Sequence, residues 1–225
     1  MGSSVKDGQT SMKKSSEPFA SLSDQLVKHE SDRGAVLVGL AALDEELEIL
    51  LRATFVQDYE VVKTSVELLF GTNGPLHTFW AKSHFAYALG ITPKPLFTDL
   101  EKLRKLRNRF AHQKLPVDFN DKEVKDLIDG LSTALEYGQH MKGKRYNLSD
   151  KGDKALAEFR AIEAGFIKYY KGCFSLCVLE ALSYLETATL IIKKAGLSMA
   201  REHARECWSG YSVNSRHERC KQTFG

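Results

Sequence analysis

The densest group of side chains that could do chemistry lies at the end of one strongly charged segment, residues 96–112. Arg107, Asn108 and His112 fall there within six positions. An arginine can hold a phosphodiester through charge-assisted hydrogen bonds, and an asparagine can orient it. A histidine that titrates near neutrality can move a proton while an RNA 2′-hydroxyl attacks phosphorus. These residue types therefore describe a metal-independent ribonuclease or an RNA-binding site.

The same residues also have a purely structural interpretation. On a helix that turns by about 100° per residue, Arg107 is expected toward the apolar seam. An unpaired buried guanidinium is costly, so its head would need either a cavity or a partner such as Asp44 or Asp32. His112 would then serve only as a cation at a helix C-terminus. The residues alone favour this structural interpretation. The neighbouring polar stripe on the same helix consists of Glu101, Arg104, Asn108 and His112.

Two further positions could bind an anion. Arg33 follows Asp32 at an expected helix start, where backbone N–H groups attract anions, but a capping role fits that sequence better. Lys82 follows the turn formers of residues 71–75, which lack the Gly-Lys-Ser/Thr arrangement of a phosphate loop. We interpret residues 71–75 as a tight turn.

Other site patterns are weak. Cys173 and Cys177 lie four residues apart on an expected helix, but no second pair has metal-ligand spacing, so we interpret both as core residues. The histidines and carboxylates show no recognised metal spacing either, and we expect neither a metal nor another cofactor. No segment offers two short helices, a tight turn and a polar recognition face, which argues against direct operator binding.

Composition sets the broad class. Hydrophobic residues make up 43% of the 225, enough for a real core. The 32 basic and 29 acidic residues leave a net charge of only +3, so the chain has no global field of the kind that marks a nucleic-acid binder. Any such contact would come from local clusters, for example the basic C-terminus.

The periodicity predicts an all-α fold, a helical bundle with a long C-terminal helical extension. Apolar residues recur at helical spacing between breaks rich in turn formers, and strand-like alternation is nearly absent. Ser31-Asp32 offers an N-cap, and Gly90 closes a helix. The expected helices are 34–52, 59–70, 79–89, 96–112, 120–137 and 154–195.

We expect a disordered tail over 1–18, a helical domain over 19–141, and an extension with a basic tail over 142–225. The extension either packs on the domain or forms a second helical unit, and it is a candidate dimerisation element. Its apolar run, residues 173–192, approaches membrane-spanning length, but Glu180 and Glu186 interrupt it and favour a buried core helix. Without signal-peptide features at the N-terminus, a cytoplasmic protein with no membrane contact is expected.

Three blocks carry a resemblance to a known family. Residues 31–55, 68–91 and 99–113 resemble the signature blocks of the mannitol operon repressor family, in the same order and spacing. The resemblance covers roughly 31–137, and the extension from 142 to 225 departs from compact members. It implies an all-helical fold and transcriptional repression in a bacterium. Because the family has no obvious DNA-binding motif, it also implies co-regulation through a protein partner, with a homodimer expected.

A shorter likeness supplies the alternative. Arg107-Asn108 with His112 resembles the Arg-(polar)-x-x-x-His motif of the HEPN superfamily of RNA-cleaving and RNA-binding domains, common in toxin–antitoxin and phage-defence systems. By that likeness Arg107 and His112 would be catalytic and Asn108 supporting, with RNA a more plausible ligand than DNA. The first hypothesis is therefore a non-enzymatic repressor, and the second a metal-independent endoribonuclease. The candidate binding residues are Arg33, Asp44, Lys82, Glu101 and Arg104.

Overall fold

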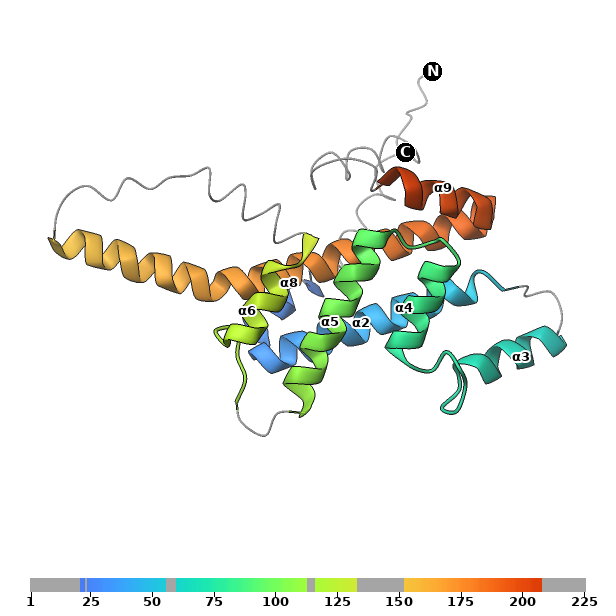
Figure 1. Cartoon of the computed structure of the whole chain (residues 1–225), viewed down its shortest axis with the longest axis horizontal. Helices are drawn as coiled ribbons and strands as arrows, with labels where there is room; N and C mark the ends of the chain where they lie inside the picture. Colours follow the sequence, from blue (N-terminus) through green and yellow to red (C-terminus); the bar gives the residue numbers. More distant parts are fainter. Residues whose placement is uncertain (1–20, 23, 56–59, 113–115, 133–151, 208–225) are drawn as a thin grey trace, which may run out of the picture.

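The computed structural model describes residues 21–22, 24–55, 60–112, 116–132 and 152–207, and every regular element in these ranges is a helix. The first element, η1, is a π-helical turn, and Figure 1 shows the α-helices that follow it packed side by side. The predicted all-α class is confirmed. The elements are η1 (Gln25–His29), α2 (Asp32–Arg52), α3 (Glu60–Phe70), α4 (Phe79–Ala88), α5 (Lys94–His112), α6 (Lys122–Asp129), α8 (Gly152–Ala195) and α9 (Leu197–Cys207).

Helix α2 is the centre of the molecule and contacts α4, α5, α8 and η1. It begins where the sequence predicts, because the Ser31 side chain accepts a hydrogen bond from the Gly34 N–H at 3.0 Å. Leucines at positions 40, 43, 47, 50 and 51 are almost fully buried. One apolar face thus anchors α2 among its neighbours.

Helix α8 packs along α2 through a close approach at Gly39. A Cβ built at Gly39 would lie 3.1 Å from the Phe174 ring and 3.3 Å from Val178, so only glycine fits without movement there. The part Tyr170–Ala195 is long and apolar enough to cross a membrane, but 61% of its most apolar window is buried inside the protein. The prediction of a buried core helix is therefore confirmed. Residues 152–169 extend past the other helices in Figure 1.

Two glycines end helices α4 and α8, and the last described helix follows the second of them. Gly90 adopts φ 72° and Gly196 adopts φ 86°, and each ends a helix in the left-handed conformation that glycine favours. Helix α9 lies against α8. Residues 170–207 of the extension thus pack on the other helices, whereas residues 152–169 extend past them. The predicted disordered tail, residues 133–151 and the basic C-terminal residues 208–225 lie outside the described residues.

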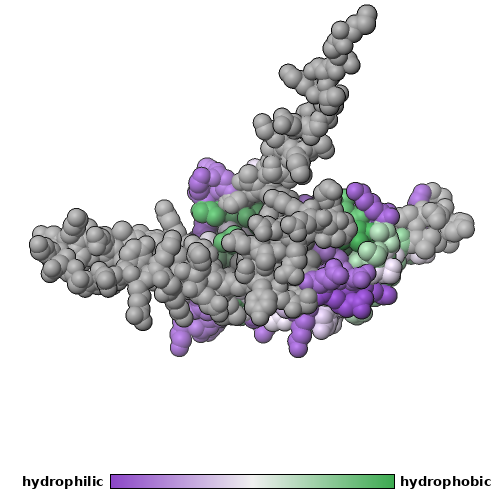
Figure 2. All heavy atoms as spheres, turned by 90° about the horizontal axis from the view of Figure 1, so that it is seen from above, coloured by the Kyte–Doolittle hydropathy of each residue, from purple (hydrophilic) through white to green (hydrophobic). Residues whose placement is uncertain are grey.

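The buried cysteines and the outer surface fit this picture. Cys173 and Cys177 are buried free thiols in the core, as predicted. Within the described ranges no group of three or more His, Cys, Asp or Glu side chains could hold a metal ion. On the face seen in Figure 2, hydrophobic and hydrophilic side chains are interspersed over the coloured part of the surface.

Candidate functional site

A hollow of about 470 Å³ opens between α2, α4 and α5. Its walls combine apolar side chains with both signs of charge, and they include three of the residues singled out in the sequence: Asp44, Lys82 and Arg107. The remaining lining residues are Leu40, Ala41, Glu45, Glu48, Ile49, Arg52 and Phe79.

Lys82 is the buried cation of this hollow. Only 4% of its side chain is exposed, and its Nζ lies 2.8 Å from Glu48 Oε2 and 3.1 Å from Asp44 Oδ1. Helix α4 thereby contributes the counter-ion for two carboxylates of α2. The side chain of Asp44 is 38% exposed and that of Glu48 is 30% exposed. Because its charge is already paired with two carboxylates, this buried ammonium group cannot bind a further anion. Lys82 therefore joins α4 to α2 rather than forming an anion site.

The ion-pair network continues along α2 to α3. Arg52 Nε donates to Glu48 Oε1 at 2.9 Å, and its two terminal nitrogens donate to the Glu67 carboxylate at 2.6 and 3.1 Å. Burial acts to raise the pKa of Glu48, but the hydrogen bonds from Lys82 and Arg52 outweigh it and hold that pKa below its ordinary value. The Arg52 guanidinium also lies 4.5 Å from the centre of the Phe70 ring. These contacts fix the orientation of the carboxylates at the mouth of the hollow.

Arg107 does not take the place predicted for it. Its side chain is exposed on α5, so the expected burial against the apolar seam is wrong, but it lines the hollow, in line with the expectation of a cavity. Among the described residues Arg107 makes no ion pair with either expected carboxylate. Asp44 is paired with Lys82 instead. Asp32 accepts a hydrogen bond from the Phe119 N–H at 3.1 Å, and its Oδ1 lies 3.5 Å from Lys171 Nζ.

The rest of the Arg-Asn-x-x-x-His motif is not gathered in a cleft. Asn108 and His112 are exposed on α5, and neither lines the hollow. On a helix, Arg107 and His112 point roughly 140° apart at 100° per residue. The described residues thus bring only Arg107 of the three motif residues into a concave site.

The other predicted binding residues have structural partners. Arg33 Nε donates to the Phe110 carbonyl at 2.7 Å and so ties the start of α2 to the last turn of α5. Arg104 donates to the Glu101 carboxylate at 3.2 and 3.3 Å. The position of Arg33 is therefore explained by packing rather than by an anion at the start of α2.

Sequence reasoning missed Glu48, Arg52 and Glu67, which carry much of the network. The available signal was the acidic run at 44–48 with an arginine four residues after Glu48, because i,i+4 pairs of opposite charge are neighbours on a helix. It also missed a row of rings from two helices, in which His84 and Tyr87 of α4 contact Phe97 of α5 and Trp80 contacts His84.

Comparison with known proteins adds the decisive observation. A family model described as the mannitol repressor matches residues 20–186, well over half of the 225 residues. The chain belongs to the mannitol repressor family. The match runs from the start of the helical body into α8, and so reaches further along the chain than the three sequence blocks within 31–137.

Relatives of this family include curated and solved proteins. The mannitol operon repressors of two Escherichia coli strains are each 28% identical over 92 residues, which is 41% of this chain and 47% of theirs. The chain thus matches just under half the length of these curated relatives. The structure of an MtlR-HPr complex from Escherichia coli aligns with a TM-score of 0.58 and 20% identity, over 74% of this chain and 97% of that one.

A second solved structure has the same arrangement. YggD of Shigella flexneri, a possible transcriptional regulator, aligns with a TM-score of 0.58 and 21% identity, over 74% of this chain and 96% of that one. At these identities both structures establish a shared mannitol repressor fold. Neither the family match nor these two structures supports the ribonuclease alternative.

Proposed function

We propose that this protein is a bacterial regulator of the mannitol repressor type that acts through contact with a partner protein, and that HPr is that partner. The observation that carries the proposal is the family match over residues 20–186. A solved neighbour of the same fold is recorded in complex with HPr, which supports a protein rather than a small molecule as the regulatory ligand. Repression of transcription would then follow from a change in that protein contact.

The hollow between α2, α4 and α5 does not suit catalysis, and its rim is one of the surfaces open to a partner protein. Its buried cation, Lys82, is held by two carboxylates and is not available to a substrate. Its exposed charges, on Arg107 and Glu45, lie at the surface where a partner can reach them. Charges at such a rim affect the rate and the salt dependence of association more than the final affinity.

The assembly and location follow as part of the same proposal. A cytoplasmic homodimer fits a regulator of this family, and RNA or DNA contact would be a secondary property of its basic segments. Multi-angle light scattering of the purified full chain measures the assembly directly. A mass twice that of the 25.3 kDa chain supports the dimer, and a monomer at all concentrations contradicts it.

Co-elution with HPr tests the function itself. The full-length protein and the HPr of its source bacterium should migrate together in size-exclusion chromatography at micromolar concentration. In parallel, deletion of the gene should raise expression of a reporter fused to the mannitol operon promoter. Separate elution together with an unchanged reporter would contradict the proposal.

A further inference from the structure

A row of aromatic side chains lies in the open on the side of α4 away from the hollow. The ring centres of Trp80 and His84 are 4.4 Å apart, those of His84 and Phe97 are 4.9 Å apart, and those of Phe97 and Tyr87 are 4.4 Å apart. Trp80 is 50% exposed and Tyr87 is 39% exposed. These four residues, the aromatic row, therefore form one continuous surface across α4 and the first turn of α5.

The exposed part of this surface is not what attaches α4 to the core. Helix α4 is held to the core by a different face, which buries Phe79, Ser83 and Ala86. Leaving an indole half in water forgoes much of the free energy that its burial would supply. Large apolar side chains exposed together, rather than scattered singly, mark interaction sites.

The aromatic row is rigid before any partner arrives. The His84 ring lies between Trp80 and Phe97, and its Nε2 lies 3.6 Å from Glu101 Oε1. Glu101 is held in turn by Arg104. A surface whose rotamers are already fixed loses little conformational entropy on binding, so more of the contact energy appears as affinity.

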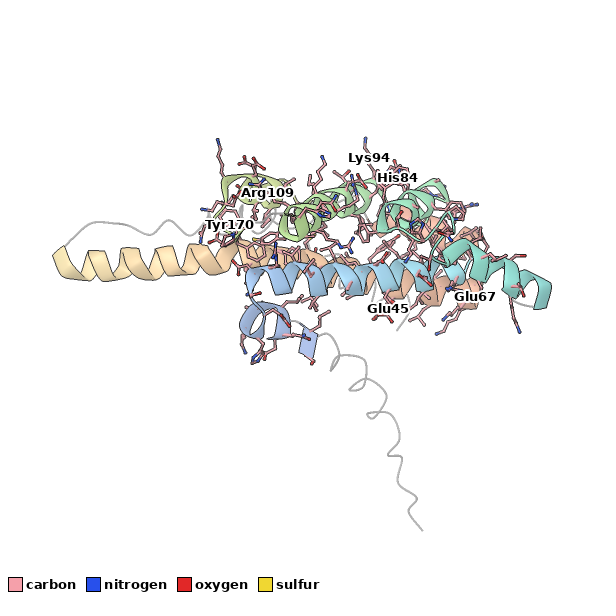
Figure 3. All side chains as sticks on the ribbon, turned by 90° about the horizontal axis from the view of Figure 1, so that it is seen from below. Glu45, Glu67, His84, Lys94, Arg109 and Tyr170 are labelled. Atoms are coloured by element: carbon pink, nitrogen blue, oxygen red, sulfur yellow. The ribbon has the colours of Figure 1, made fainter. Side chains whose placement is uncertain are left out.

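The charges at its border are mainly positive. Lys94 is exposed one helical turn before Phe97, and Figure 3 places Lys94 and His84 on the same edge of the molecule. Arg104 and Glu101 lie at the same border and pair with one another, which leaves the exposed Lys94 to attract a partner. A partner that fits this border presents a carboxylate beside its apolar side chain.

The geometry favours a protein over single-stranded nucleic acid. Base stacking needs free ring faces, but here the Tyr87 and Phe97 faces cover one another with an interplanar angle of 10°. Arg104 is engaged with Glu101 rather than free for a phosphate. Tryptophan, tyrosine and arginine together are instead the residue types that dominate binding energy at protein interfaces.

We propose that the aromatic row, bordered by Lys94 and Arg104, is the surface on which the partner protein docks, through an apolar side chain flanked by a carboxylate. This inference rests on the proposed function, because it names the place where that partner binds. The hollow on the other side of α4 would then be a structural junction, not the docking site.

Calorimetric titration of HPr into folded full-length variants tests the surface. Trp80→Ala should weaken binding at least about tenfold, as expected for an aromatic anchor. Lys94→Glu, at an exposed position, should weaken it severalfold, and more so at low salt. Leu68→Ala is the matched control, since Leu68 is a 71% exposed apolar residue on α3, and it should leave the affinity unchanged.

The outcomes separate the two proposals. If the unmodified chain binds HPr but Trp80→Ala and Lys94→Glu bind equally well, the docking surface is wrong and the proposed function stands. Loss of binding in Arg107→Ala or Glu45→Lys alone would assign docking to the hollow instead. If the unmodified chain binds labelled single-stranded RNA and the Trp80→Ala variant does not, while both bind HPr with the same affinity, the occupant is nucleic acid and the inference is overturned. Failure of the unmodified chain to bind HPr would contradict both proposals.

Discussion

Lys82 Nζ lies 2.8 Å from Glu48 Oε2 although only 4% of the lysine side chain is exposed. This pair joins α4 to α2, and Arg52 continues the connection from Glu48 to α3. The first and second sequence blocks of the family resemblance are thus linked by charge as well as by apolar packing. The network joins α2, α3 and α4 on one side of the hollow.

Removal of the buried cation should destabilise the protein. Lys82→Met leaves the carboxylates of Asp44 and Glu48 without their shared counter-ion, and we expect a loss of about 2 kcal/mol in the free energy of unfolding. This is less than for a fully buried pair, because both carboxylates reach solvent. Urea denaturation measures it, with the exposed Lys105→Met as control. Equal stability of the two variants would show that the network contributes nothing to folding.

Two carboxylates that face each other from α2 and α8 should make stability depend on pH. Burial raises the pKa of Glu186, and the charge of Glu46 raises it further. The pKa of Glu46 is also raised, first by burial and then by Glu45, while Lys193 opposes the shift. A carboxyl with a raised pKa favours folding below its ordinary pKa, and this advantage is lost as the pH rises through the folded-state value.

Glu186→Gln should therefore stabilise the protein at neutral pH. We expect a gain of roughly 0.5 kcal/mol at pH 7, kept small by solvent screening, and no gain near pH 4, where both carboxyls accept protons more readily. Thermal unfolding at the two pH values measures the difference. Glu202→Gln on α9 is the control. A gain that is equal at both pH values would exclude ionisation as its cause.

The close approach of α2 and α8 should not tolerate a branched side chain. Gly39→Val places methyl groups where Phe174 and Val178 already lie within 3.3 Å of an added Cβ. Overpacking of this kind costs about 1–3 kcal/mol, so the melting temperature should fall by several degrees. Val38→Ala at the neighbouring, partly buried position serves as comparison. An unchanged melting temperature for Gly39→Val would contradict the packing of α8 on α2.

The Arg-Asn-x-x-x-His motif should be dispensable for folding and inactive toward RNA. Because Arg107 and His112 are exposed, the double variant Arg107→Ala/His112→Ala should keep its stability within about 0.5 kcal/mol. Incubation of the unmodified protein with total RNA in EDTA should give no cleavage. Cleavage by the unmodified protein that the double variant abolishes would establish the ribonuclease alternative after all.

Much of the fold was predictable from local sequence. The spacing of Leu100, Leu103, Leu106 and Phe110 indicated one buried face of α5, and all four are fully buried. Ser31 and Gly90 marked helix ends because capping depends on residues next to the helix itself. The long C-terminal helix was also predicted, since Glu180 and Glu186 distinguish a core helix from a membrane span.

The side-chain pairings were less predictable because they depend on how distant helices cross. Asp44 was considered as an ion-pair partner of Arg107, but it pairs with Lys82, 38 residues further along the chain. Sequence reasoning thus singled out three residues that line the hollow, Asp44, Lys82 and Arg107, but missed Glu48 and Arg52 and did not give the observed partners. Likewise Trp80, His84 and Tyr87 recur on one side of α4, but Phe97 joins them only through the packing of α5 against α4.

The central claim is that this member of the mannitol repressor family acts by binding a protein. The most direct measurement is a calorimetric titration of the unmodified full-length chain with HPr from the same bacterium, at physiological salt. The account predicts saturable binding with one HPr for each chain and a dissociation constant in the micromolar range or tighter. No heat of binding at protein concentrations up to about 100 µM would contradict it.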